Sequence, residues 1–378
     1  MNSEFPQELL DEILEHFATD FGSLKICSLV CRAWVFRPRS HLFSSVHLLP
    51  KNIVFVRNLL SSPNCTLLSH IQSLHVFRDY EHKNDRRFNE IVASLHRLTN
   101  LRVLKLTTRN ISAADAEAYF HTDFFAAFPQ VARLVLSLRL DSEHDEQQPT
   151  PLLLVISLFP ALQELRIGRL DGSVITQASA VPPHGLRSLY LTEESMGPIF
   201  RWLRACNRLH NVHSVKLPCI YRQHVDSVRP ALQRLGGVLH HLDIFVQWPS
   251  TADSSMVFDF SLHPNLKTLA IRDTSWDSSG HRQFLLWMTR LAAPTLERLT
   301  LSLDLSLYDS NFDWAALDAF LCSARFPGLQ SVVIECNHRR YRYDNHQFLH
   351  EALPLLESSG VLRTVCKARV WSPFGPYA

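Results

Sequence analysis

Residues 5 to 48 carry more apolar surface than a three-helix segment of that size can bury on itself. Pro6 suits the first position of a helix, because its φ is fixed and its missing N–H would have no partner there. From this residue on, apolar side chains follow helical spacing and acidic side chains cover the opposite side. The apolar stripe consists of Leu9, Leu10, Ile13, Leu14 and Phe17.

The next segment, from Leu24 to Trp34, is apolar all around the predicted helix instead of along one side. One side of such a helix can serve an internal core while another side stays open. A segment of about 45 residues rarely stabilises itself alone. The surplus therefore predicts a docking partner, and the alternative is a short helical cap on the domain that follows.

The rest of the chain repeats a phrase with apolar residues at its first, fourth and sixth positions. Successive phrases begin between 24 (162 to 186) and 33 (296 to 329) residues apart. Several phrases have a proline two residues before them, which ends the preceding helix and directs the chain into a strand. The phrases begin at Phe43, Ile71, Leu101, Val131, Leu162, Leu186, Val212, Leu239, Leu266, Leu296, Leu329 and Leu362.

Segments with helical periodicity lie between these phrases. Strand and helix alternating every 24 to 33 residues predict a solenoid of stacked repeats. The apolar run Leu152 to Ile156 predicts a buried helix. The periodic segments are Glu90 to Leu98, Asp115 to Phe128, Gln283 to Leu291, Trp314 to Phe326 and Phe348 to Leu356.

The N-terminal segment resembles an F-box. The matching residues are Phe5-Pro6-x-Glu8-Leu9-Leu10-x-x-Ile13-Leu14, then Leu29-Val30-Cys31-Arg32-Ala33-Trp34, then Leu42-Phe43, in the order and at the spacings of that family. The second and third blocks look most like fungal members. Phe5 stands where the family usually has leucine, an exchange that apolar contacts tolerate.

In that family the module binds a Skp1-type adaptor of a cullin–RING ubiquitin ligase, and the rest of the chain selects the substrate. The resemblance implies that residues 1–48 hold such an adaptor and, through it, the cullin and RING subunits. The residues that it implies as adaptor contacts, or as their immediate support, are Pro6, Leu9, Leu10, Ile13, Leu14, Leu29, Val30, Cys31 and Trp34.

Residues 49–366 resemble a leucine-rich-repeat solenoid. The predicted fold class is therefore α/β, with a short three-helix F-box followed by an irregular horseshoe that has its parallel sheet on the concave side. Asn337 is the clearest candidate for the asparagine ladder common in that family. The last phrase ends in Lys367 where an apolar residue is expected, which predicts a capping repeat, and residues 367–378 are predicted to form a cap or tail.

Composition favours a cytoplasmic or nuclear protein without a membrane segment. The longest apolar run is far below the roughly 18 residues needed to cross a bilayer. The 8 cysteines contain no CxxC pair, so neither a disulfide framework nor a thiolate zinc site is indicated. With 38 basic and 36 acidic side chains, the net charge of +2 does not indicate nucleic-acid binding.

Candidate catalytic residues are sparse, and we expect no catalytic residues, metal or cofactor. His346 and His350 lie four residues apart as in HExxH zinc sites, but Gln347 replaces the glutamate that would act as general base. A metal-dependent hydrolase centred on these histidines is the enzymatic alternative. Asp277, Ser279 and His281 are interpreted as turn residues, since adjacency in sequence supplies no triad geometry.

Recognition is better supported by the outward-facing strand positions. Side chains alternate along a strand, so the third and fifth phrase positions point away from the core. These positions form a mixed cationic and aromatic row, and arginine and tyrosine often dominate binding energy. The predicted substrate-binding residues in this row are Arg133, Arg166, Tyr190, Lys216 and Arg298.

The segment Asn337 to Tyr343 is a second candidate, because its basic residues and tyrosines could clamp a phosphorylated or acidic peptide. A solvated loop is the competing interpretation. The acidic segment Asp141 to Glu146 is predicted to be a loop. Trp371, Phe374 and Tyr377 are predicted to cover the open end of the solenoid.

These patterns predict a non-catalytic substrate receptor of an SCF-type ubiquitin ligase that binds an unknown target protein. The alternative is a repeat scaffold with a ligase-independent binding role, in which the N-terminal helices serve as a cap.

Overall fold

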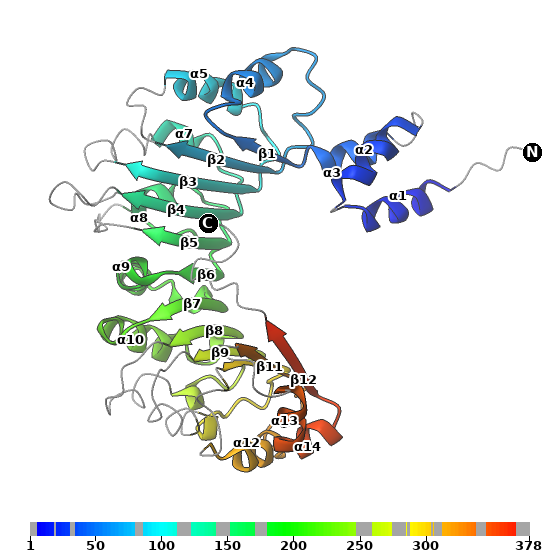
Figure 1. Cartoon of the computed structure of the whole chain (residues 1–378). Coiled ribbons are helices and arrows are strands. Elements are labelled where there is room, and N and C mark those ends of the chain that lie inside the picture. Colours follow the sequence, from blue (N-terminus) through cyan, green and yellow to red (C-terminus); the bar gives the residue numbers. More distant parts are fainter. Residues whose placement is uncertain are drawn as a thin grey trace, which may run out of the picture. The chain divides into compact units, whose positions relative to one another are not determined.

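Each predicted phrase leads into a β-strand in the computed structural model (Figure 1). From Phe43 to Leu329, every strand begins two residues after the first apolar residue of its phrase. The structure describes residues 6–18, 20–30, 35–79, 86–111, 122–140, 152–170, 180–246, 259–273, 285, 288–303, 305, 312–337 and 345–367. The chain forms two compact units, Met1–Gln163 with Asp171–Pro183, and Glu164–Leu170 with His184–Ala378.

The first unit contains the N-terminal helices and four strands. The strands pair in chain order, and the registered pairs are parallel. Its helices are α1 Gln7–His16, α2 Phe21–Val30, α3 Phe36–Leu42, α4 Ile53–Ser61, α5 Arg86–Leu95, α7 Thr122–Ala126 and α8 Leu152–Ser157, and its strands are β1 Ser45–Leu48, β2 Ser73–Asp79, β3 Val103–Ile111 and β4 Arg133–Leu140.

The second unit continues the same pattern with eight strands, which again pair in parallel and in chain order. Its strands are β5 Glu164–Leu170, β6 Ser188–Leu191, β7 Ser214–Ile220, β8 His241–Val246, β9 Thr268–Asp273, β10 Arg298–Leu303, β11 Ser331–Asn337 and β12 Leu362–Lys367. Its α-helices are α9 Glu193–Ala205, α10 Val225–Leu235, α12 Trp314–Leu321, α13 Asn345–Ala352 and α14 Pro354–Ser358.

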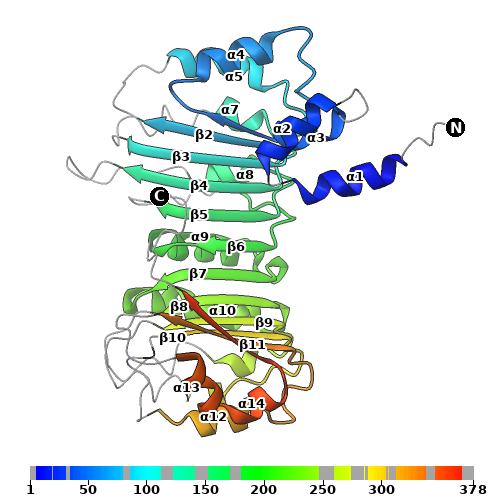
Figure 2. The ribbon, with the colours of Figure 1, turned by 45° about the vertical axis from the view of Figure 1, so that its right-hand side comes forward.

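Side chains alternate between the two faces of each sheet, as predicted. In β4, Leu134 and Leu136 are fully buried, whereas Arg133 is exposed and Val135 is only half-buried. Helices cover the buried side, and Figure 2 shows α9 and α10 on one side of β6, β7 and β8. The predicted apolar helix is confirmed as α8, in which Leu152, Leu153, Val155 and Ile156 are buried and Leu154 is half-buried.

A ladder of side-chain hydrogen bonds joins successive repeats just before the strands begin. Each donor is the polar residue directly before the first apolar residue of a phrase, and each acceptor is a backbone carbonyl of the preceding repeat. The bonds are Asn100 Nδ2 to Ser69 O at 2.9 Å, Gln130 Nε2 to Leu98 O at 3.1 Å, Asn211 Nδ2 to His184 O at 3.2 Å, Asn265 Nδ2 to Gly237 O at 2.7 Å, and Thr295 Oγ1 to Leu266 O at 3.1 Å.

The last strand follows a different register from the one that its phrase predicts. The phrase aligns Leu362 with Leu329, but Leu362 pairs with Val332, three residues further along. Gly360 explains the shift, because its φ of +72° ends α14 in a sharp turn and brings the chain into the sheet at once. The amide of Val332 already donates to the carbonyl of Val361 at 2.9 Å. Arg363 and Val365 consequently point outward.

The helix boundaries differ from the periodic segments. α12 begins at Trp314 as predicted, with Asp313 accepting from the amide of Ala316 at 2.9 Å. The predicted helix Phe348 to Leu356 is two helices, because Pro354 starts α14. α5 begins four residues before Glu90. Residues 112–121 and 281–284, within or beside two further predicted helices, lie outside the described residues, as do the acidic segment 141–146 and the aromatic tail.

In the described part of the chain, no helix is long and apolar enough to cross a membrane.

A buried carboxylate fixes the junction between α12 and α14. Asp318 is 2% exposed, and its two oxygens accept from the amides of Leu355 and Leu356 at 2.8 and 2.9 Å. These amides belong to the first turn of α14 and have no partner within the helix.

We expect Asp318→Ala to lower the free energy of unfolding by about 2 kcal/mol, because two buried N–H groups lose their acceptor. Urea unfolding followed by circular dichroism measures the change. The matched control is Asp313→Ala, which removes one exposed helix cap and is expected to cost about 1 kcal/mol. An equal cost for the two variants would contradict this role of Asp318.

Candidate functional site

The stripe of apolar side chains on α1 is open to solvent. Leu9 is 46% exposed, Ile13 39% and Phe17 37%, at intervals of four residues along one side of the helix. Pro6, directly before the helix, is exposed as well. Water contact on this scale is unfavourable for side chains of this type, so the stripe is a candidate docking surface.

A second apolar surface lies on α2. Ile26 is 69% exposed and Leu29 85%, and the neighbouring Val30 and Phe21 are also exposed. Asp20 begins this helix, since its Oδ1 accepts from the amides of Gly22 and Ser23 at 3.0 and 3.1 Å. The Ser23 hydroxyl donates to Oδ2 at 2.6 Å. This hydroxyl is the main cause that holds the pKa of Asp20 below its ordinary value.

The buried core within α1 and α2 is small. Leu14 and Leu24, at 1% and 0% exposure, are its fully buried apolar side chains among the described residues of the two helices. Leu14 therefore cannot contact an adaptor directly and serves as support for the exposed stripe. The predicted contacts Leu9, Ile13, Leu29 and Val30, by contrast, are accessible.

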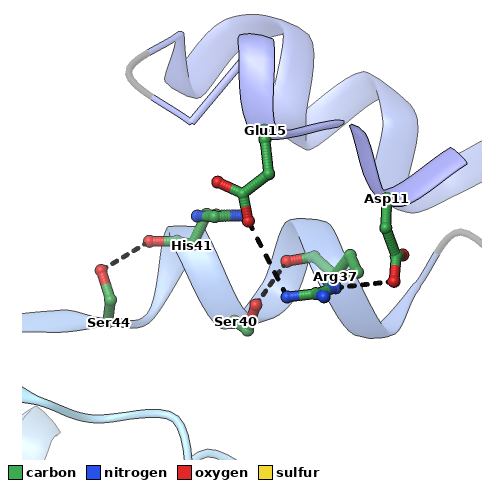
Figure 3. A network of polar contacts seen from close by, with 6 residues as sticks. All are labelled: Asp11, Glu15, Arg37, Ser40, His41 and Ser44. Atoms are coloured by element: carbon green, nitrogen blue, oxygen red, sulfur yellow. Dashed lines mark hydrogen bonds and ion pairs between the residues drawn. The ribbon is translucent and has the colours of Figure 1, made fainter. Parts of the chain in front are cut away.

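Polar contacts hold α1 against α3, as Figure 3 shows. Arg37 Nε lies 3.1 Å from Asp11 Oδ2, and Arg37 Nη1 lies 3.8 Å from Glu15 Oε1. His41 Nε2 approaches the same Glu15 oxygen at 3.4 Å without hydrogen-bond geometry. These contacts use the acidic side of α1, so the apolar stripe is left free for a partner.

Some predicted residues fall outside what the structure describes. Cys31 and Trp34 lie in the segment 31–34, and the side chain of Leu10 is not described. Phe17, Phe21 and Ile26 were missing from the predicted contact set although they are exposed. Phe17 belonged to the recognised stripe, so helical spacing alone could have added it.

On the sheet of the second unit, three of the predicted binding residues come together. Tyr190 in β6 is the direct cross-strand neighbour of Arg166 in β5 and of Lys216 in β7. Lys216 Nζ lies 5.6 Å from the centre of the Tyr190 ring, within cation–π range. Arg166 pairs with Glu164 on its own strand. Parallel register therefore converts positions 24 to 26 residues apart in sequence (166 to 190, 190 to 216) into one surface.

The other two predicted residues stand on other strands. Arg298 is exposed, but it occupies a different row, where it pairs with Thr268 and Ser331. Arg133 lies on β4 in the first unit, where its neighbour is Val103.

Two charged residues that were not in the predicted set complete the group. Asp243 Oδ2 lies 2.7 Å from Lys216 Nζ and 3.1 Å from Arg272 Nη2. Burial is the main cause that raises the pKa of Tyr190, and the Asp243 carboxylate adds to it while Arg272 and Arg166 oppose it. The tyrosine therefore carries its hydroxyl proton at neutral pH. Asp243 could have been found as the neighbour of Lys216 in the register, whereas Arg272 comes from the next row.

A groove of about 390 Å³ lies between α9 and α10. Its acidic side chains Glu193, Glu194 and Asp226 come from the first helical turns and Arg204 from the last turn of α9, positions that the helix dipole favours. Burial lowers the pKa of His224 in this groove, and its Nδ1 accepts from the amide of Tyr221 at 3.1 Å. The charged side chains of this groove are therefore explained by their stabilising effect on the ends of α9 and α10.

His350, one of the two histidines considered for zinc, has another partner. His350 Nδ1 lies 2.6 Å from Glu357 Oε2 of α14, and the side chain of His346 is not described. Among the described residues, no group of three or more histidine, cysteine or acidic residues could hold a metal ion. Asp277, Ser279 and His281, like residues 338–343 of the second recognition candidate, lie outside the described ranges, as does the side chain of Asn337.

Comparison with known proteins adds no assignment: no family model and no curated protein matches this chain.

The cap of α2 gives a test by pH. A carboxyl group with a depressed pKa in the folded state stabilises that state above its ordinary pKa of about 3.9, and the contribution is lost as pH falls through the lower value. We expect Asp20→Asn to lower the melting temperature near neutral pH, because asparagine keeps an acceptor but lacks the charge. The difference from wild type should shrink as the pH falls to about 3. A difference that stays constant with pH would contradict the role of the charge.

Proposed function

We propose that the chain is the substrate-recognition subunit of an SCF-type cullin–RING ubiquitin ligase and is not itself catalytic. Its N-terminal helices α1 to α3 would act as an F-box that binds a Skp1-like adaptor. The strand repeats would hold a target protein.

The open apolar surface of α1 and α2 carries this proposal. Full burial of an exposed apolar side chain contributes about 1.5 to 3 kcal/mol, so Leu29 would gain most of this and the half-buried Leu9 and Ile13 roughly half of it. The small internal core of these helices gives them no such burial within the described chain. The same positions carry the sequence resemblance to the F-box, so the exposed surface and the motif support one interpretation.

Proximity explains how such a receptor acts. A bound target is held near a ubiquitin-loaded conjugating enzyme, which raises the effective concentration of the target's lysines at the thioester. The receptor supplies binding and spacing, and the chemistry takes place on other subunits. A rigid stack of in-register strands suits this task, because it fixes the position of a bound target within its unit.

The docking surface is tested with Leu9→Asp combined with Ile13→Asp. We expect this variant to bind a purified Skp1-type adaptor about a hundredfold more weakly, since two buried apolar contacts become buried carboxylates. Biolayer interferometry with immobilised adaptor measures the affinity. Affinity purification from cells then shows whether cullin is recovered with the wild type and lost with the variant.

The matched control is Phe55→Asp combined with Leu59→Asp. These residues are also exposed, also four apart, and lie on α4 of the same unit. The control should bind adaptor normally. Equal affinity of the α1 variant and the wild type would exclude the α1 stripe as the docking surface, and absence of adaptor and cullin from wild-type purifications would favour the repeat-scaffold function.

A further inference from the structure

The group around Asp243 contains more positive than negative charge. One oxygen of Asp243 serves both Lys216, at 2.7 Å, and Arg272, at 3.1 Å. The three side chains come from neighbouring strands β7, β8 and β9. The direct neighbour of Asp243 on β9 is Ala270, whose methyl group leaves room for Arg272 to reach the carboxylate from two residues further on.

Both cations of the group keep unused hydrogen-bonding capacity. An ammonium and a guanidinium each carry several N–H donors, and Asp243 takes one contact from each. The side chains of Lys216 and Arg272 are 34% and 38% exposed, so solvent and a partner can reach them. Tyr190, next to Lys216, adds an aromatic ring and a hydroxyl donor.

Two acids beside this group, among the residues that the structure describes, already have cationic partners. Glu164 pairs with Arg166, and Asp243 pairs with two cations. A cation from a partner would therefore compete with three resident cations for these two acids. An anion would instead meet donors that are positioned but not saturated.

We propose that Tyr190, Lys216 and Arg272 form a docking site for an acidic or phosphorylated residue of a protein partner, with Asp243 as the resident counter-ion. Asp243 keeps the two cations in place before the partner binds. It also competes with the incoming anion for the two cations. A neutral segment therefore gains no binding free energy at this site, and only a negatively charged residue displaces the carboxylate. The inference rests on the proposed function only in identifying the docked segment as part of a ligase target.

The test uses the purified full chain and three fluorescent degenerate peptide pools that differ only in a fixed central residue: phosphoserine, glutamate or lysine. Fluorescence polarisation should show that the phosphoserine and glutamate pools bind more tightly than the lysine pool. The ratio between the first two pools distinguishes a phosphate from a carboxylate as the preferred group. Added salt should weaken the binding of the acidic pools, because the attraction is between charges.

Substitutions in the group should act in opposite directions. Lys216→Gln and Arg272→Gln should each weaken binding of the preferred pool about tenfold, the loss of one charge-assisted hydrogen bond. Asp243→Asn should strengthen it several-fold, because it removes the competing anion. Lys267→Gln is the matched control, an exposed lysine of the same unit that stands directly before β9 and pairs with Glu297, and it should leave the affinity unchanged.

Several results would overturn the proposal. Preference for the lysine pool, or weaker binding of acidic pools by Asp243→Asn, would make Asp243 the binding group for a cation. Equal binding of all pools by the wild type would exclude a charged site, and this result needs no variant to fold. The assay contains no adaptor, and Leu9→Asp with Ile13→Asp should keep the peptide preference, so failure here is distinct from failure of adaptor docking.

Discussion

A single strand of this chain cannot bury its own apolar side, and this constraint determines the rest of the structure. Each repeat supplies a strand whose backbone groups and alternate side chains are satisfied only by the repeat before and the repeat after it. Parallel pairing places equivalent positions side by side, as Leu104 and Leu134 show in the first unit. The polar ladder before the strands adds a second contact between the same neighbours. Asn265, for example, donates to the carbonyl of Gly237 in the preceding repeat. Each interior repeat in a unit therefore depends on its neighbours for both apolar burial and hydrogen bonding.

The N-terminal helices satisfy this constraint less well than the repeats do. Their small internal core contains the buried side chains of Leu14 and Leu24. Ion pairs from the acidic side of α1 to Arg37 add to these apolar contacts. Exposed ion pairs of this kind contribute little to stability, about 0 to 1 kcal/mol each. Burial of the apolar side chains that remain exposed to solvent is consequently the largest stabilisation still open to this segment. A partner that covers them would complete its core, which is why adaptor binding and the stability of these helices should be coupled.

Local patterns predicted most of the fold, and long-range contacts account for what they missed. Strand starts were predictable because the phrase and its preceding proline act within a few residues. The register of β12 was not, because it depends on the turn at Gly360, where a positive φ shortens the connection from α14. The prediction of Asn337 as a ladder residue falls on a side chain outside the described part of the chain. The hydrogen-bond ladder that the structure does describe has its donors before the strands, and their function is seen only once the carbonyls of the preceding repeat are in place. Likewise, Tyr190 and Lys216 could be placed in one row from the alternation of side chains. Arg272, however, reaches Asp243 diagonally across Ala270, and the spacing of residues along the sequence does not predict such a contact.

Leu14 shows the same limit in a helix, since a wide apolar stripe does not say which of its members face inward.

The two candidate surfaces follow different physical rules, and this difference bears on how a receptor could combine them. The α1 and α2 surface is apolar, so its binding free energy depends on buried area and changes little with salt. The Lys216, Asp243 and Arg272 group is ionic and half-exposed, so each of its contacts contributes little binding free energy and is weakened by salt. Its main effect is on selectivity, because it disfavours partners with the wrong charge. In the proposed function, the adaptor would always be the same partner, and a permanent subunit interface of this kind benefits from the first kind of surface. A target that must be released after modification benefits from the second kind, because modest charge-based affinity allows selection without slow dissociation.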